Sequence, residues 1–134
     1  MSRLFLLLLL GACAAQAEGV AWRSWDAGLE EARQSGKMVM IDAVRDGCHY
    51  CDDMEAAVFR DAEMAADLER CVVPVKVNLT HTQMPLDLSV PMTPSFFFIE
   101  GGTRLVKMIP GSWNREDFRS FLDALPGCEP AAKE

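Results

Sequence analysis

Basic residues are scarce in this sequence, in which 13 lysines and arginines stand against 20 aspartates and glutamates, a formal net charge of −7. Binding to nucleic acid depends on cations that contact phosphates, and an anionic membrane surface attracts basic segments. The composition therefore argues against both as partners. The chain also lacks internal repeats and linker-like stretches. Its 134 residues predict one domain with a core of its own.

The sequence has no apolar run long enough to cross a bilayer, because a spanning helix needs about 20 such residues. A short apolar block at residues 4–10 follows Arg3 and precedes the small-x-small triplet Ala15-Gln16-Ala17. This order is typical of an export signal. We therefore predict a signal peptide at 1–17, a mature domain at 18–134, and a periplasmic or otherwise exported protein. Without Arg3 the balance is 12 basic against 20 acidic residues, a charge of −8.

An alternative export route is open. Leu10-Gly11-Ala12-Cys13 resembles a lipobox, in which Cys13 would carry the lipid and become the first residue. The domain would then be anchored to a membrane by that lipid alone. We expect the soluble form, and the mass of the intact mature protein distinguishes the two.

Apolar periodicity and turn residues predict an α/β fold with a central mixed sheet flanked by helices. Pro74 is awkward inside its strand because proline cannot donate a ladder hydrogen bond. The expected strands are 20–23, 38–44, 72–78, 95–99 and 104–109; the expected helices are 25–35 after Ser24, 48–59, a helix capped by Asp61, a single turn at 84–88, and 115–125 after Asn114.

Two cysteines, Cys48 and Cys51, flank a His-Tyr pair directly after the predicted strand 38–44. A C-x-x-C pair in that position is a redox signature, because the N-terminus of the following helix stabilises a thiolate. The alternative is a metal site that uses both cysteines and His49. Structural zinc takes four ligands, usually from two such pairs, and the sequence has no second pair. We therefore favour redox chemistry without a bound metal, with a copper-handling protein as the alternative.

Two charged residues lie in the predicted strands next to the dithiol. Asp42 is a carboxylate in an otherwise apolar strand, so burial is expected to raise its pKa. Lys76, on a neighbouring strand, would either pair with Asp42 or extend to solvent, and both interpretations stay open. His49, next to Cys48, would favour the Cys48 thiolate when its imidazole is protonated.

Residues 20–125 resemble the thioredoxin-fold family in register. C-H-Y-C follows the second strand, Asp42 lies six residues before Cys48, and Lys76-Val77-Asn78 resembles the lysine-bearing third strand. Thr93-Pro94 occupies the position of the family's cis-proline. The segments W-x-x-(x)-L, M-E-x-x-V-F-x-D-x-x-M and I-P-G-S-W resemble exported thioredoxin-related proteins, including the SoxW-like group and the C-terminal domain of DsbD.

The resemblance implies a thiol–disulfide oxidoreductase that needs no cofactor, because the dithiol itself carries two electrons. In such a protein Cys48 attacks, Cys51 resolves the mixed disulfide, Asp42 accepts the proton and Thr93-Pro94 guides an extended substrate. Tyr50 matches a C-x-Y-C form found in some periplasmic isomerases and is assigned to the substrate-binding surface. The implied partners are protein thiols or disulfides and an upstream redox protein, and we expect a monomer. Reductase is the favoured direction, with isomerase or oxidase as the alternative.

Two further cysteines remain outside the dithiol. Cys71 precedes the predicted third strand and Cys128 follows the last helix. In a thioredoxin fold those two ends lie at the pole opposite the active site. A structural disulfide between them and a pair of free thiols are both open.

Overall fold

The computed structural model describes residues 19–130, so the predicted export signal and Cys13 lie outside the described residues. A π-helical segment, Glu55–Phe59, directly follows the helix His49–Met54, and a 3₁₀ turn, Pro85–Asp87, lies between the strands Val72–Asn78 and Ser95–Glu100. The described elements are, in order, α1 (Trp25–Ser35), β1 (Met38–Val44), α2 (His49–Met54), α3 (Ala62–Cys71), β2 (Val72–Asn78), β3 (Ser95–Glu100), β4 (Arg104–Pro110) and α4 (Arg115–Asp123).

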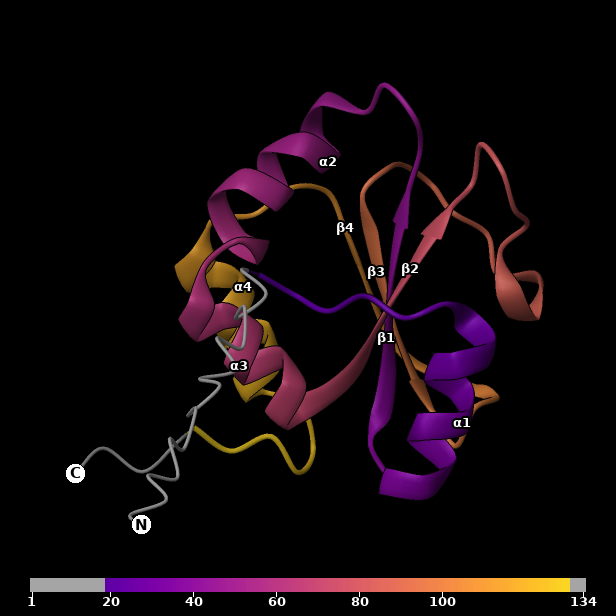
Figure 1. Cartoon of the computed structure of the whole chain (residues 1–134), viewed down its shortest axis with the longest axis vertical. Helices are drawn as coiled ribbons and strands as arrows, with labels where there is room; N and C mark the ends of the chain where they lie inside the picture. The colour runs from indigo at the N-terminus through magenta and orange to yellow at the C-terminus, as the bar shows by residue number, and fades with distance from the viewer. Residues whose placement is uncertain (1–18, 131–134) are drawn as a thin grey trace, which may run out of the picture.

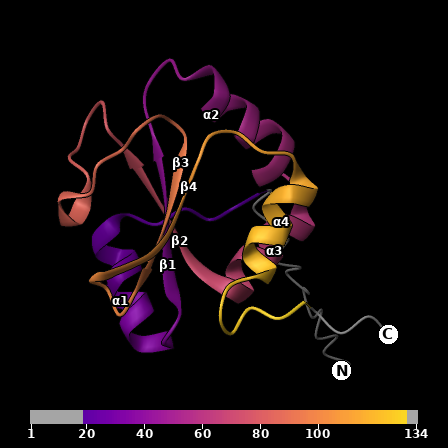
Figure 2. The ribbon, with the colours of Figure 1, turned by 180° about the vertical axis from the view of Figure 1, so that it is seen from behind.

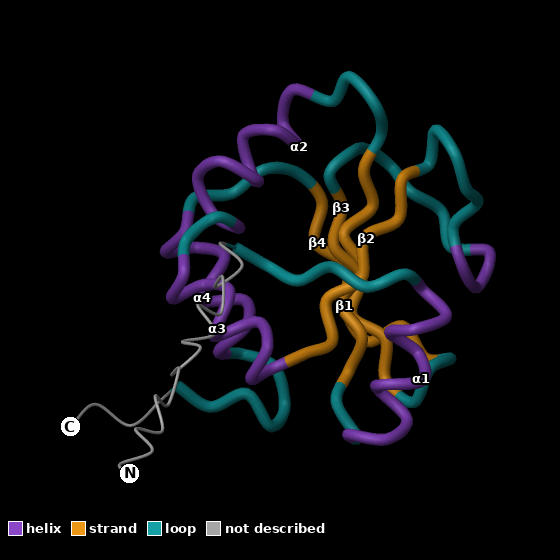
Figure 3. Tube along the Cα trace, viewed as in Figure 1, coloured by secondary structure: helices purple, strands orange, loops and turns teal. Residues whose placement is uncertain are grey.

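The strands form one mixed sheet in the order β2-β1-β3-β4. β1 runs parallel to β2 and antiparallel to β3, and β3 pairs antiparallel with β4. Helix α1 and the loop between β2 and β3 lie on one face of this sheet, and α2, α3 and α4 lie on the other (Figures 1 and 2). The predicted α/β class with a central mixed sheet is therefore confirmed, and Figure 3 shows the strands enclosed by helices and loops.

Strand β1 lies at the centre of the fold because six of its seven residues are buried. Val39, Ile41 and Ala43 belong to the apolar cluster under α1. Met40 belongs to the opposite cluster, under the other three helices. Since side chains alternate along a strand, Asp42 shares the face of Met40. The single acid of β1 is therefore directed toward the α2 side of the sheet.

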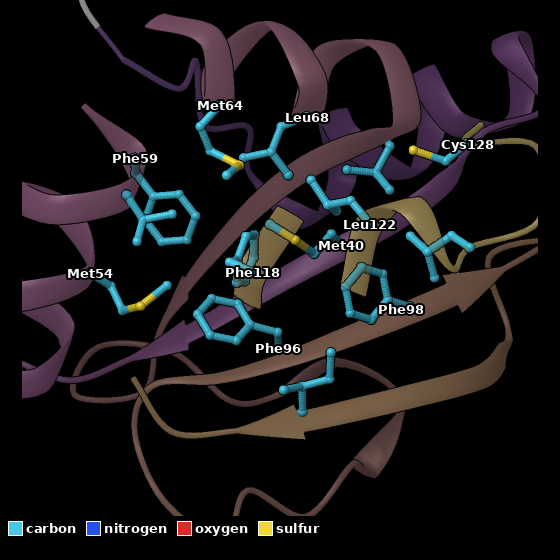
Figure 4. Packing of buried hydrophobic residues seen from close by; sticks show 14 residues of the cluster. Met40, Met54, Phe59, Met64, Leu68, Phe96, Phe98, Phe118, Leu122 and Cys128 are labelled. Carbon is cyan, nitrogen blue, oxygen red and sulfur yellow. The ribbon is translucent and has the colours of Figure 1, made fainter. Parts of the chain in front are cut away.

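Three phenylalanines hold the helices of that side against the sheet. Phe59, Phe96 and Phe118 come from the π-helical segment, β3 and α4, and their rings meet edge to face with centroids 5.0 to 5.9 Å apart (Figure 4). All three are almost completely buried. Each buried aromatic ring of this kind removes roughly 150–250 Å² from water, so this cluster is a main source of the stability of the α2–α4 face.

The predicted helix starts are confirmed by their caps. The side chains of Ser24, Asp61 and Asn114 accept hydrogen bonds from the backbone N–H groups of Ala27, Met64 and Asp117. Each cap satisfies a donor that the first helical turn leaves without a partner, which contributes about 1 kcal/mol.

The predicted first strand at residues 20–23 is wrong. Only one parallel bridge forms there, between Arg23 and Val75. The N–H of Val20 donates instead to the carbonyl of Phe59 (3.2 Å), and the Trp22 ring packs edge to face on Phe59 at 5.0 Å. This segment therefore follows the helical layer, because its apolar side chains pack there, and it reaches the sheet at a single residue.

Pro74 lies inside β2 without breaking it. The bridge to Arg23 lies on the outer edge of β2, where Arg23 N–H donates to Pro74 O (3.0 Å) and Lys76 N–H donates to Arg23 O (3.1 Å). The nitrogen and carbonyl of one strand residue point to the same side. The missing N–H of Pro74 therefore faces the open edge and not β1, which is where a strand tolerates proline.

The C-terminal segment is joined to the start of β2. A disulfide links Cys71 to Cys128, with Cα atoms 5.0 Å apart, and Cys128 is buried. Arg70 reinforces the junction by donating to the carbonyl of Glu129 (2.6 Å). The link closes the end of the molecule opposite the α2 end of β1, across 57 residues of sequence.

We predict that this disulfide stabilises the fold by closing a long loop in the unfolded chain. A loop of this length gives a loss of about 4 kcal/mol in the free energy of unfolding when Cys71 and Cys128 are both replaced by alanine. The measurement is urea unfolding followed by circular dichroism. Cys48→Ser/Cys51→Ser is the matched control, because it removes the other disulfide, which spans only three residues. An equal loss in both double variants would contradict the prediction.

Candidate active site

The dithiol of the C-x-x-C motif lies where β1 ends and α2 begins. Cys48 and Cys51 are joined by a disulfide with Cα atoms 5.2 Å apart. Cys48 is the N-cap of α2, and its sulfur accepts a hydrogen bond from the backbone N–H of Cys51 (3.2 Å). Gly47 has a φ of +66°, a turn conformation that favours glycine and lets the chain enter the helix at Cys48. Both cysteines are half-buried.

This geometry favours a thiolate at Cys48 once the disulfide is reduced. The first backbone N–H groups of a helix have no partner within the helix, and the dipole there favours negative charge. The N–H of Cys51 already lies within hydrogen-bonding distance of the Cys48 sulfur. A thiolate is the nucleophile of thiol–disulfide exchange, so the arrangement is suited to that reaction.

Asp42 lies in β1, six residues before Cys48, and is only 2 % exposed. Burial raises its pKa to about 7, the positive charge of Lys76 opposes the rise, and the negative charge of Glu55 adds to it. Among the described residues, its Oδ1 atom has no hydrogen-bond partner. A buried carboxyl group with this pKa is able to accept and release a proton near neutral pH.

Lys76 lies opposite Asp42 in the parallel β1–β2 register. Its ammonium group bonds to Glu55 (3.1 Å) and lies over the ring of Trp22, 4.5 Å from the ring centroid. Neither expectation for Lys76 foresaw Glu55 as its partner. The spacing could have predicted that Glu55 lies on the same helix face as Cys51, because the two residues are four positions apart.

A cleft opens beside Cys51. It has a volume of about 400 Å³, and its lining brings together residues from the β1–α2 turn, α2 and β2. Cys51, Glu55 and Lys76 all line it. The cleft gives solvent a route to Cys51 and to the Glu55–Lys76 ion pair.

The two residues between the cysteines point outward. The side chain of His49 is 81 % exposed, and its Nε2 atom lies 3.4 Å from Asp53 Oδ2, one turn along the helix. Tyr50 is 58 % exposed and contacts the His49 ring edge to face. His49 is thus paired with a carboxylate of α2, while Tyr50 presents an aromatic ring at the surface.

Thr93 and Pro94 lead into β3, the strand next to β1. The peptide bond between them is cis. The carbonyl of Pro94 accepts a hydrogen bond from Gly111 (2.8 Å), and the buried Ser95 hydroxyl donates to the carbonyl of Met92 (2.6 Å). These bonds hold the turn in place, and Met92 is 48 % exposed beside it.

One contact near the dithiol was not anticipated from the sequence. His81 lies 2.8 Å from Asp46 through its Nε2 atom. Asn78 donates to the other carboxylate oxygen of Asp46, also at 2.8 Å. The hydrogen bond from Asn78 and the proximity of His81 hold the pKa of Asp46 below its usual range.

The comparisons with known proteins agree with this geometry. The profile of the thioredoxin-like domain family matches residues 25–126. This chain belongs to the thioredoxin-like family. With its C-x-x-C dithiol at the start of α2, it is a thiol–disulfide oxidoreductase of the thioredoxin type. No curated protein matches it by sequence.

Solved structures support the family assignment. A thioredoxin from Thermus thermophilus is 29 % identical over 78 % of this chain and 85 % of its own, with a TM-score of 0.66. The oxidised C-terminal domain of DsbD from Neisseria meningitidis is 15 % identical over 77 % and 97 % (TM-score 0.62). The periplasmic thioredoxin SoxS from Paracoccus pantotrophus is 18 % identical over 70 % and 100 % (TM-score 0.56). The last two likenesses show the fold.

Two further observations concern metals and membranes. Within residues 19–130, no three histidine, cysteine, aspartate or glutamate side chains are grouped so that they could hold a metal ion. Of the helices in the same range, none combines the length and the apolar character that crossing a bilayer requires.

We predict that Asp42 makes the protein less stable as the pH rises. Its folded pKa of about 7 lies above the usual aspartate value of 3.8, so the folded state holds the proton more tightly than the unfolded state. As far as Asp42 is concerned, the free energy of unfolding is therefore highest below pH 4. It falls as the pH rises from 4 to 7 and levels off above pH 7. The shift corresponds to at most about 4 kcal/mol.

The measurement is the free energy of urea unfolding at pH 5 and pH 8. Asp42→Asn should be more stable than the unsubstituted protein at pH 8, with a smaller advantage at pH 5. Asp67→Asn on α3 is the matched control and should show no such trend. A difference between Asp42→Asn and the unsubstituted protein that does not depend on pH would contradict the assignment.

Proposed function

We propose that the protein is an exported disulfide reductase that acts on other exported proteins. The observation that carries the proposal is the dithiol at the N-terminus of α2 above a buried carboxyl group whose pKa lies near 7. The export signal predicted at residues 1–17 supports the location, as do structural relatives that include a periplasmic thioredoxin. Residues 18–134 form the working domain, and we expect it to act as a monomer.

The reaction begins with the reduced dithiol. The Cys48 thiolate attacks a substrate disulfide, forms a mixed disulfide with one substrate sulfur and releases the other as a thiolate. Cys51 then loses its proton and attacks the Cys48 sulfur, which forms the Cys48–Cys51 disulfide and releases the second substrate thiolate. Two electrons pass to the substrate, and an upstream redox protein returns them to the dithiol.

Asp42 is the proton acceptor for Cys51 in this proposal. Its pKa near 7 matches the task, because a general base works best when its pKa is close to the working pH. Glu55 and Lys76 line the cleft that Cys51 also lines, so they set the charge next to this step. The bond between them keeps the Lys76 ammonium partly engaged and leaves Asp42 less strongly paired.

The substrate binds at the turn before β3 and at the exposed end of α2. We assign Thr93 to backbone hydrogen bonds with an extended substrate segment, in the manner of an added strand, and Pro94 to the shape of that turn. Tyr50 supplies an exposed apolar contact. His49 tunes the Cys48 thiolate through its charge.

The first test traps the substrate. Cys51→Ser should accumulate mixed disulfides through Cys48, because the resolving step is blocked, whereas Cys48→Ser should trap none. Non-reducing gels followed by mass spectrometry of trapped proteins in the exported fraction give the readout. Equal trapping by both variants would exclude Cys48 as the nucleophile.

The reduction potential of the Cys48–Cys51 couple decides the direction. A reductase should lie near the thioredoxin value of about −270 mV, and an oxidase near the DsbA value of about −120 mV. Equilibration with glutathione buffers measures it. A value at the oxidising end would replace reductase by oxidase or isomerase. Tight stoichiometric metal binding by the reduced form, without disulfide reduction, would favour the copper-handling alternative.

We further predict that Glu55→Gln lowers the pKa of Asp42. The substitution removes a negative charge that raises this pKa and frees Lys76, whose positive charge lowers it. The pH midpoint for resolution of the mixed disulfide by Cys51 should therefore move to lower pH, as measured by stopped-flow fluorescence. In Asp42→Asn the step should be slower by about 100-fold and lose that midpoint.

Glu63→Gln is the matched control, since Glu63 lies on α3 and pairs with Arg119. It should leave the midpoint where it is in the unsubstituted protein. A midpoint in Glu55→Gln that equals that of the control would show that the Glu55–Lys76 pair does not act on Asp42.

A further inference from the structure

The turn that follows β2 holds Asp46, the residue two positions before Cys48. Both carboxylate oxygens of Asp46 are engaged, one by Asn78 Nδ2 and the other by His81 Nε2, each at 2.8 Å. The backbone N–H of Asp46 donates to the Thr80 hydroxyl at 3.0 Å. All of these contacts come from residues 78–81, which we call the Asn78–His81 turn.

The turn is itself fixed relative to β1. The side chain of Asn78, the first residue of the turn, accepts a hydrogen bond from the N–H of Thr80 (3.0 Å). The backbone carbonyl of Asn78 accepts one from the N–H of His81 (3.1 Å). The N–H of Leu79 donates to the carbonyl of Val44, the last residue of β1 (2.8 Å). The groups that hold Asp46 are therefore anchored to the strand that carries the dithiol.

The negative charge of Asp46 can affect the ionisation of Cys48 because Asp46 is close to Cys48 in the sequence. Two residues apart, the Cα atoms of Asp46 and Cys48 are separated by at most about 7 Å. Asp46 also lines the cleft that Cys51 lines. A carboxylate free to move there would approach the Cys48 sulfur, and a nearby negative charge disfavours a thiolate.

We propose that the Asn78–His81 turn holds the Asp46 carboxylate away from Cys48 and thereby keeps the Cys48 thiol reactive. Asn78 and His81 are positioning residues in this account, since they act on the sulfur only through Asp46. The inference rests on the proposed function, because it concerns the nucleophile of that reaction.

Other charged groups face this pair and share its field. Asp26, at the start of α1, lines with His81 the pocket between α1 and the turn. The charged residues that line the cleft together with Asp46 are Arg45, Asp52, Glu55 and Lys76. None of them belongs to the Asn78–His81 turn, so substitutions in the turn leave them in place.

The test measures the reactivity of Cys48 directly. The full chain, with Cys51→Ser, is treated with iodoacetamide between pH 5 and pH 9, and alkylation of the Cys48 peptide is followed by mass spectrometry. His81→Ala should slow alkylation at pH 6 by about threefold to tenfold, since a unit charge brought to about 6 Å at an effective dielectric constant of about 40–80 changes ionisation by that factor. His81 is 67 % exposed, so the substitution does not threaten folding.

A second substitution separates charge from loop geometry. Asn78→Ala should slow alkylation in the same direction, and adding Asp46→Asn to either variant should abolish the slowing, because no charge is left to approach the sulfur. Arg115→Gln is the control, since it removes a remote surface ion pair with Asp61 and should not slow alkylation. At pH 9 the rates of all variants should converge.

Two outcomes would overturn the proposal: an unchanged rate in His81→Ala, or slowing that persists when Asp46→Asn is present. The alkylation assay needs no protein substrate. A protein that fails to reduce disulfides but shows this pattern would therefore refute the proposed function alone. A protein that reduces disulfides without the pattern would refute this inference alone.

Discussion

The structure depends on the burial of β1, which is covered on both faces and paired along both edges. β2 lies on one side of it and β3 on the other, and apolar clusters cover both faces. The helices pack against the two faces of the sheet that β1 and its neighbouring strands form. The strand ends shortly before the dithiol, so the two cysteines follow directly on a strand that is buried and paired along both edges.

The same burial raises the pKa of the one carboxyl group in β1. An apolar strand stabilises the fold by removing side chains from water, but Asp42 loses its hydration in the same place, and its pKa rises to about 7. Lys76, opposite it, bonds to Glu55 rather than neutralising the rise completely. The burial that stabilises the strand therefore raises the pKa of its one acid, and strongly shifted pKa values of this kind cluster at functional sites.

The surroundings of the dithiol come from separate parts of the chain. The turn after β2 engages Asp46, the turn before β3 holds Thr93 and Pro94, and the two cysteines lie at the start of α2. At the opposite pole, the Cys71–Cys128 disulfide closes the C-terminal segment onto the start of β2. One disulfide is half-buried at a helix start, and the other has Cys128 in the core, which suits exchange in the first and permanence in the second.

Much of the fold could be predicted from local patterns. The caps Ser24, Asp61 and Asn114 act on backbone groups three residues away, and the strands at 38–44 and 72–78 are recognisable from their apolar runs. The strand predicted at 20–23 was wrong because its packing depends on distant residues and not on a local pattern. Three of its four side chains are apolar, but whether they pack on a sheet or on a helix depends on partners such as Phe59, far along the chain.

The sequence by itself determined the C-x-x-C dithiol, the single acid in the central strand and the order of the elements, because each depends on neighbours within a few residues. Only the tertiary structure decided which groups meet across long separations. Lys76 pairs with Glu55, His81 with Asp46, and Cys71 with Cys128 because parallel pairing of β1 with β2 and packing of α4 beside α3 bring them together. No local pattern records which strands and helices become neighbours, and the electrostatics of the site depend on that choice.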